Sequence, residues 1–172
     1  MNITTRLAGL DDVDAIARLI DAMDIHYHGL GNTAGLEATR RMVARTFADR
    51  EGTRFFIATR DGDDIGIACC AVVHPGTRLT GMVFLKDLFV TAEARNSGAG
   101  EALIAALAAH ARDNGYGRIE FYTDTTNTAA QRSASTIGLA LHVWKRWCIA
   151  STARRWSTCS AATVELPELQ VG

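Results

Sequence analysis

The sequence lacks the features of extracellular and membrane-spanning proteins. Its 172 residues include only four cysteines and two prolines, and no cysteine pair has the C-x-x-C spacing of zinc and redox motifs. Cys69 and Cys70 are adjacent in an apolar run, which is typical of buried thiols in a reducing compartment. No apolar stretch is long enough to cross a bilayer, and the first residues do not read as a signal peptide. We therefore expect a cytoplasmic protein with no membrane partner.

An excess of one charge is also missing. Eighteen basic residues against nineteen acidic ones give a net charge of −1, whereas a dedicated nucleic-acid binder normally has a basic excess. We therefore expect no nucleic-acid partner. The local exception is the stretch 125–164, which has five basic residues and no acidic one. It either attracts an anionic ligand or is a set of solvated side chains, and the sequence leaves both interpretations open.

The composition that remains is that of one globular domain. Hydrophobic residues make up 48% of the chain and charged residues 22%, which is enough for a full core at this length. The order of periodic segments predicts an α/β or α+β fold in which helices cover a sheet. We expect one domain over residues 1–150 and an extension over 151–172, either disordered or forming an interface. The expected helices cover residues 13–23, 36–47, 101–111 and 127–138, and the expected strands cover 53–59, 65–73, 81–90, 118–123 and 143–149.

A glycine-rich turn is the most informative motif. Residues 95–100 read RNSGAG and separate a strand from a helix. The first turn of a helix has unpaired N–H groups and partial positive charge, and glycines allow a bulky anion to approach the backbone. The turn therefore predicts a phosphate site. It is not a Walker loop, because Glu101 and Ala102 follow instead of GK[ST], and Leu103 stands where a dinucleotide fingerprint needs glycine.

RNSGAG resembles the [RQ]-x-x-G-x-[GA] turn of the GCN5-related N-acetyltransferases, the GNAT family. Three further family motifs follow the expected order, and the resemblance covers roughly residues 2–150. It is closest to the diamine (spermidine/spermine-like) N-acetyltransferase branch, whose strand reads D-x-F-V. The matching residues are Asp87, Phe89 and Val90 on the strand, Asn127 and Ala130 at a helix start, and Trp144, Trp147 and Ile149 on a later strand.

The resemblance implies acetyl-CoA as co-substrate, no metal, and a homodimer. It also implies a mixed central sheet of about six or seven strands flanked by about four helices, with the turn between strand 4 and helix 3. A bulge at Leu88–Val90, again implied by the resemblance, frees an N–H for the acetyl oxygen. The backbone groups of Leu88 and Val90 are therefore candidate catalytic groups. The implied cofactor-binding residues are Leu88, Phe89, Val90, Arg95, Asn96, Ser97, Gly98, Ala99, Gly100, Glu101, Asn127 and Ala130.

The proton-transfer side chains of the branch are not carried over. Lys86 stands at the position of its base glutamate, and Ala134 at the position of its acid tyrosine. Asp87 is the substitute we consider, either binding or deprotonating a cationic amine or engaged in an ion pair. The candidate acceptor-binding residues are Asp24, Tyr27, His28 and Asp87.

The predicted function is transfer of the acetyl group of acetyl-CoA to a primary amine of a small molecule, polyamine- or amino-acid-like, by direct attack in a ternary complex. One alternative is a non-catalytic acyl-CoA-binding module, which Lys86 and Ala134 keep open. Another is a protein-lysine or N-terminal acetyltransferase.

Overall fold

The computed structural model describes residues 2–49, 52–75, 80–124, 142–147 and 158–165. Seven strands form one mixed sheet in the order β1-β2-β3-β4-β5-β7-β6. The β4–β5 pair is parallel and every other neighbouring pair is antiparallel. The strands are β1 (Ile3–Leu7), β2 (Thr53–Arg60), β3 (Asp63–Val73), β4 (Met82–Val90), β5 (Arg118–Asp124), β6 (His142–Trp147) and β7 (Thr158–Glu165).

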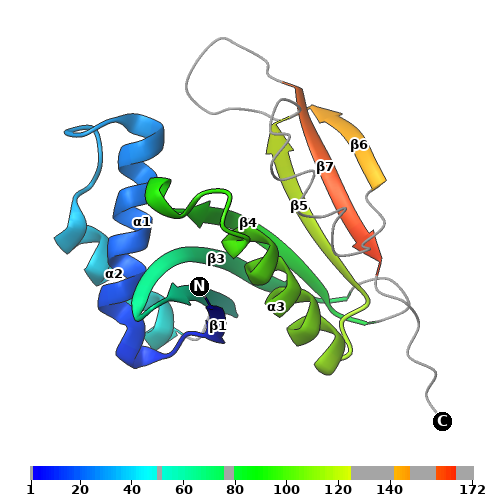
Figure 1. Cartoon of the computed structure of the whole chain (residues 1–172). Helices are drawn as coiled ribbons and strands as arrows, with labels where there is room; N and C mark the ends of the chain where they lie inside the picture. The colour runs from blue at the N-terminus through cyan, green and yellow to red at the C-terminus, as the bar shows by residue number, and fades with distance from the viewer. Residues whose placement is uncertain (1, 50–51, 76–79, 125–141, 148–157, 166–172) are drawn as a thin grey trace.

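Three α-helices among the described residues cover the two faces of this sheet (Figure 1). The helices α1 (Val13–His28) and α2 (Leu36–Asp49) pack on one face, and α3 (Ala99–Asp113) packs on the other. The mixed α+β fold predicted from the sequence is therefore confirmed. The expected helix at 127–138 lies outside the described residues.

Successive side chains of each strand point to opposite faces of the sheet, which explains why there is a core on each face. Phe55 and Ile57 point to the α1/α2 side, whereas Phe56 between them points to the α3 side. On β3, every residue from Ile65 to Cys70 is buried, which confirms the central strand predicted from its continuous apolar run.

The helices follow from local sequence. In α1, Ile16 and Leu19 are buried at helical spacing. Gly29 ends the helix with a positive φ of +83°, which favours glycine. In α3, the buried face consists of Ala99, Leu103, Ile104, Leu107, Ala108 and Ala111. None of the helices in the described ranges is long and apolar enough to cross a membrane.

The last described strand lies inside the sheet. β7 pairs with β5 along one edge and with β6 along the other. Residues 158–165, which fall in the stretch expected to be an extension, thus continue the central sheet of the domain (Figure 1).

Candidate active site

The ladder between β3 and β4 contains a β-bulge at Lys86. Cys69 pairs with Asp87 and Cys70 pairs with Leu85, so Lys86 has no partner on β3. The resemblance had placed the bulge at Leu88–Val90, but these residues pair regularly with β3. That expectation was wrong by two to four residues, because the position of a bulge depends on the register of the neighbouring strand and not on the bulged sequence alone.

Beyond the bulge, β4 separates from its other neighbour. The parallel pairing with β5 runs only from Met82–Arg118 to Leu85–Phe121, and the two strands diverge toward their carboxyl ends (Figure 1). On the β5 side, the backbone groups of residues 86–90 have no ladder partner within the described part of the chain. An extended ligand with amide groups can therefore hydrogen-bond along this edge.

The turn after β4 is shaped to bind an anion. Thr91 N–H donates to the Ile65 carbonyl at 2.9 Å, and Ser97 Oγ donates to the Ala94 carbonyl at 2.6 Å. Asn96 and Gly98 adopt left-handed conformations with φ +59° and +89°. These bonds and dihedrals direct the chain into α3, so that the positive end of the helix dipole lies at the turn.

Gly98 is the point where the turn stays open. It is the N-cap of α3, and a Cβ added there would meet nothing within 4 Å. The glycine is thus required by its backbone conformation, and no atom of the described residues fills the space beside it. Together with the helix dipole, this geometry fits the pyrophosphate of a CoA thioester.

Asp87 is engaged in an ion pair. Lys86 Nζ lies 2.6 Å from Asp87 Oδ2, with the Lys86 side chain 67% exposed and that of Asp87 26% exposed. Burial lowers the pKa of Lys86, but the hydrogen bond and charge of Asp87 outweigh it, so the net pKa is raised. The sequence left two roles open for Asp87, and the structure shows it in the ion pair.

Cys69 lies opposite Asp87 on β3. Burial, with the charge of Asp87 as a second cause, raises the pKa of the Cys69 thiol to about 11. The thiol is therefore protonated and uncharged at neutral pH, which makes it a small apolar wall of the site and not a nucleophile.

The predicted acceptor residues divide into two groups. Asp24 on α1 acts on Lys86 through its charge alone, as the smallest of the effects on the pKa of Lys86. Tyr27 and His28 are exposed at the end of α1, where the His28 carbonyl accepts a hydrogen bond from Asn32 Nδ2 at 3.0 Å. Asn127, Ala130 and Ala134 belong to the undescribed part of the chain.

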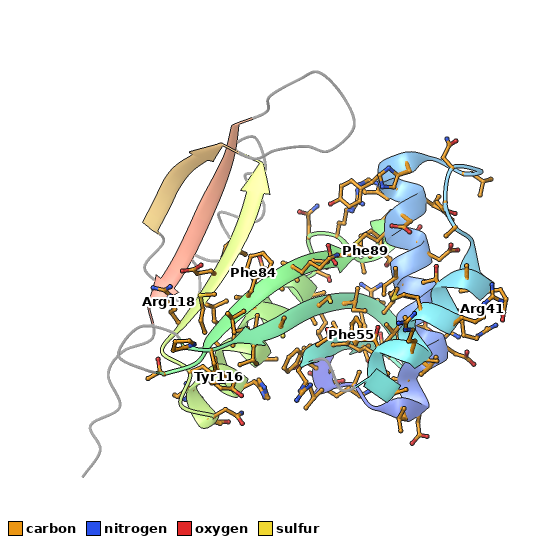
Figure 2. All side chains as sticks on the ribbon, turned by 180° about the vertical axis from the view of Figure 1, so that it is seen from behind. Arg41, Phe55, Phe84, Phe89, Tyr116 and Arg118 are labelled. Atoms are coloured by element: carbon orange, nitrogen blue, oxygen red, sulfur yellow. The ribbon has the colours of Figure 1, made fainter. Side chains whose placement is uncertain are left out.

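His26, the neighbour of the candidate acceptor residues Tyr27 and His28, lies at the glycine turn. Its Nε2 lies 3.1 Å from Nη2 of Arg95 in the turn, and its ring centroid lies 6.3 Å from that of Phe89. Figure 2 shows Phe89 at the end of β4 beside α1. No local pattern could have indicated this contact, since it joins residues 69 positions apart.

Comparison with known proteins agrees with this geometry. The model of the "Acetyltransferase (GNAT) family" matches residues 21–138, more than half of the chain. Aminoglycoside N(6')-acetyltransferase type 1 of Stenotrophomonas maltophilia is 34% identical over 76 residues, which are 42% of this chain and 50% of that protein. The match thus spans about half the length of this curated relative.

Solved structures share the fold at low sequence identity. An integron cassette protein of V. cholerae superposes with a TM-score of 0.75 at 22% identity, covering 88% of this chain and 94% of that one. An acetyltransferase of Salmonella typhimurium, solved with its cofactor acetyl-CoA, has a TM-score of 0.73 at 18% identity, covering 98% and 96%. The family predicted from the glycine turn is confirmed. The chain therefore belongs to the GNAT acetyltransferase family.

Proposed function

We propose that the protein acetylates a primary amine of a small, cationic molecule by direct attack on acetyl-CoA in a ternary complex. The observation that carries this proposal is the edge of β4 at residues 86–90, which has no ladder partner on the β5 side among the described residues and leads into the Gly98 turn. A pantetheine arm extended along this edge of β4 and a pyrophosphate at the Gly98 turn would belong to one molecule of CoA thioester.

In this proposal, backbone groups make most of the contacts with the cofactor. The N–H groups at residues 95–101 bind the pyrophosphate, and the β4 backbone at Leu88–Val90 binds the pantetheine arm and the acetyl oxygen. The thioester supplies an activated acetyl group. The amine nitrogen forms a bond to the carbonyl carbon, the carbon–sulfur bond breaks, and the thiolate takes a proton from solvent.

The acceptor side favours a cation. Asp87 and Asp24 both act on the Lys86 ammonium, so an acceptor ammonium entering the site finds the same two carboxylates. Asp87 then takes the proton that the amine must lose, directly or through water. The S. maltophilia relative is named for aminoglycosides, which are polycationic amines and agree with this chemistry.

The first test measures CoA thiol release from acetyl-CoA across a panel of polyamines, amino acids, aminoglycosides and lysine peptides. Turnover with a small cationic amine is expected. Turnover confined to lysine peptides would contradict the proposed acceptor class. Tight binding of acetyl-CoA without turnover on any amine would favour the non-catalytic module instead.

The second test addresses the cofactor site. Gly98→Glu places a carboxylate where the pyrophosphate binds, and we expect the Kd for CoA to rise at least about tenfold. Calorimetric titration with CoA measures this without an acceptor. Gly98→Ala separates the cost of the left-handed backbone from that of the charge, and an equal loss in both variants would argue against phosphate binding there.

A further inference from the structure

The cofactor turn is held by a residue from the acceptor side of the molecule. His26 lies in the last turn of α1, and Arg95 begins the turn that leads into α3. Arg95 Nη2 lies 3.1 Å from His26 Nε2. α1 and the end of β4 approach each other at this point (Figure 1).

The chemistry of the two side chains sets the direction of this bond. A guanidinium has only N–H donors, so Arg95 donates and His26 Nε2 accepts through its lone pair. The contact therefore requires an uncharged imidazole with its proton on Nδ1. A guanidinium has five N–H donors in a planar fork, and this contact uses one of its nitrogens, so the same side chain can also bind a phosphate oxygen.

The imidazole is itself placed by its neighbours. Its ring lies 5.2 Å from that of Tyr27 and 6.3 Å from that of Phe89, between centroids. Phe89 is 6% exposed and belongs to the core between the sheet and α1. The imidazole thus packs beside a buried residue of β4, next to the backbone proposed to bind pantetheine.

We infer that His26 is a positioning residue for the cofactor: it orients the Arg95 guanidinium toward the pyrophosphate of acetyl-CoA. The inference rests on the proposed use of the Gly98 turn for pyrophosphate. An arginine on an exposed turn has many rotamers, and fixing one of them before the ligand arrives lowers the entropy lost on binding. His26 therefore acts on CoA through Arg95 and does not serve as a base for the acceptor amine.

Calorimetry with CoA tests this inference in a double-mutant cycle. His26→Phe keeps the ring packing against Phe89 and removes the acceptor nitrogen, and Arg95→Ala removes the guanidinium. We expect each to raise the Kd for CoA by about fivefold to tenfold, and the double variant to be no weaker than Arg95→Ala alone. His26→Gln, whose amide oxygen can accept the same bond, is expected to recover most of the lost affinity.

A second probe separates positioning from a structural role. Pantetheine lacks the pyrophosphate, so its affinity, followed by NMR titration, should be the same in His26→Phe and the wild type. Arg112→Ala, at the opposite end of α3, is the matched control for loss of an exposed arginine and should bind CoA like the wild type.

The outcomes are distinguishable. A wild-type protein that does not bind CoA overturns the proposed function. A wild type that binds CoA while His26→Phe binds equally well overturns this inference alone. Additive effects in the cycle, or an equal loss of pantetheine affinity, show that His26 acts by another route and also overturn it.

Discussion

At the scale of the residue, the Lys86–Asp87 pair sets the charge of the proposed acceptor site. The 2.6 Å contact neutralises the carboxylate nearest the bulge, so an incoming ammonium must compete with an ammonium already in place. The pair is half open to solvent, and exposed ion pairs contribute only about 0.2–1 kcal/mol. Exchange of one cation for another is therefore energetically easy.

Removing Lys86 should improve acceptor binding. In Lys86→Met, Asp87 loses its internal partner, and we expect the KM for a cationic acceptor to fall about threefold. Steady-state kinetics at saturating acetyl-CoA measure this. Lys86→Arg keeps a cation beside Asp87 and is the matched control.

Removing the carboxylate should have the opposite effect. Asp87→Asn keeps the shape of the side chain but takes no proton from the amine, and kcat/KM for the acceptor should fall about tenfold or more. A pH–rate profile of both proteins provides the readout. Wild-type rates in Asp87→Asn would show that solvent alone deprotonates the amine.

At the scale of the element, the junction of β3, β4 and α3 positions the cofactor edge. A Cβ at Gly66 would lie 3.0 Å from the Phe89 carbonyl oxygen and 3.3 Å from side-chain atoms of both Val90 and Leu103. The glycine therefore lets the end of β4 pack tightly between β3 and α3. The same residues connect the core to the backbone edge that is proposed to bind pantetheine.

Gly66→Ala should consequently lower both stability and CoA affinity. The added methyl group forces the end of β4 away from β3, and such overpacking typically costs about 1–3 kcal/mol. Urea unfolding measures the free energy of unfolding. Gly9→Ala is the control, because nothing lies within 4 Å of its added Cβ and its φ of −122° suits alanine; equal stability in the two variants would contradict the close packing.

At the scale of the whole molecule, the rings of His110, Phe56 and Tyr116 form an aromatic cluster away from the candidate site. The His110 ring on α3 lies 5.4 Å from that of Phe56 and 6.2 Å from that of Tyr116, between centroids. Burial, and next the charge of Arg54, lower the pKa of His110 from its usual 6.5, against a weaker opposing effect of Asp113. This histidine links folding to pH.

The direction of the pH effect on stability depends on whether the folded or the unfolded chain binds the His110 proton more readily. The unfolded chain takes up the His110 proton near pH 6.5, whereas the folded protein takes it up only at lower pH. The contribution of His110 to stability is thus present above pH 6.5 and is lost as the pH falls through the lowered value. Urea unfolding between pH 7.5 and about 5 should show a shallower decline in His110→Gln than in the wild type. The exposed His28→Gln variant should follow the wild type; parallel curves for all three proteins would contradict this linkage.

Much of the fold could be predicted from local pattern. The period of Ile16 and Leu19 predicts α1, the apolar run at residues 65–73 predicts the central strand, and RNSGAG predicts the start of α3. Each of these depends on backbone preferences within a few residues, which are the same wherever the segment is placed.

The sequence by itself thus determined the three described helices, most of the strands, the glycine turn and the family, but it did not predict β1 or β7. Only the tertiary structure decided the bulge at Lys86, the ion pair that occupies Asp87, and the contact of His26 with Arg95. These features depend on strand register and on contacts between distant segments, which are set when the two cores pack against the sheet. The physical reason is that the local sequence pattern determines which face of a helix or strand a side chain occupies. Which other side chains it contacts on that face is determined by the packing of the whole chain.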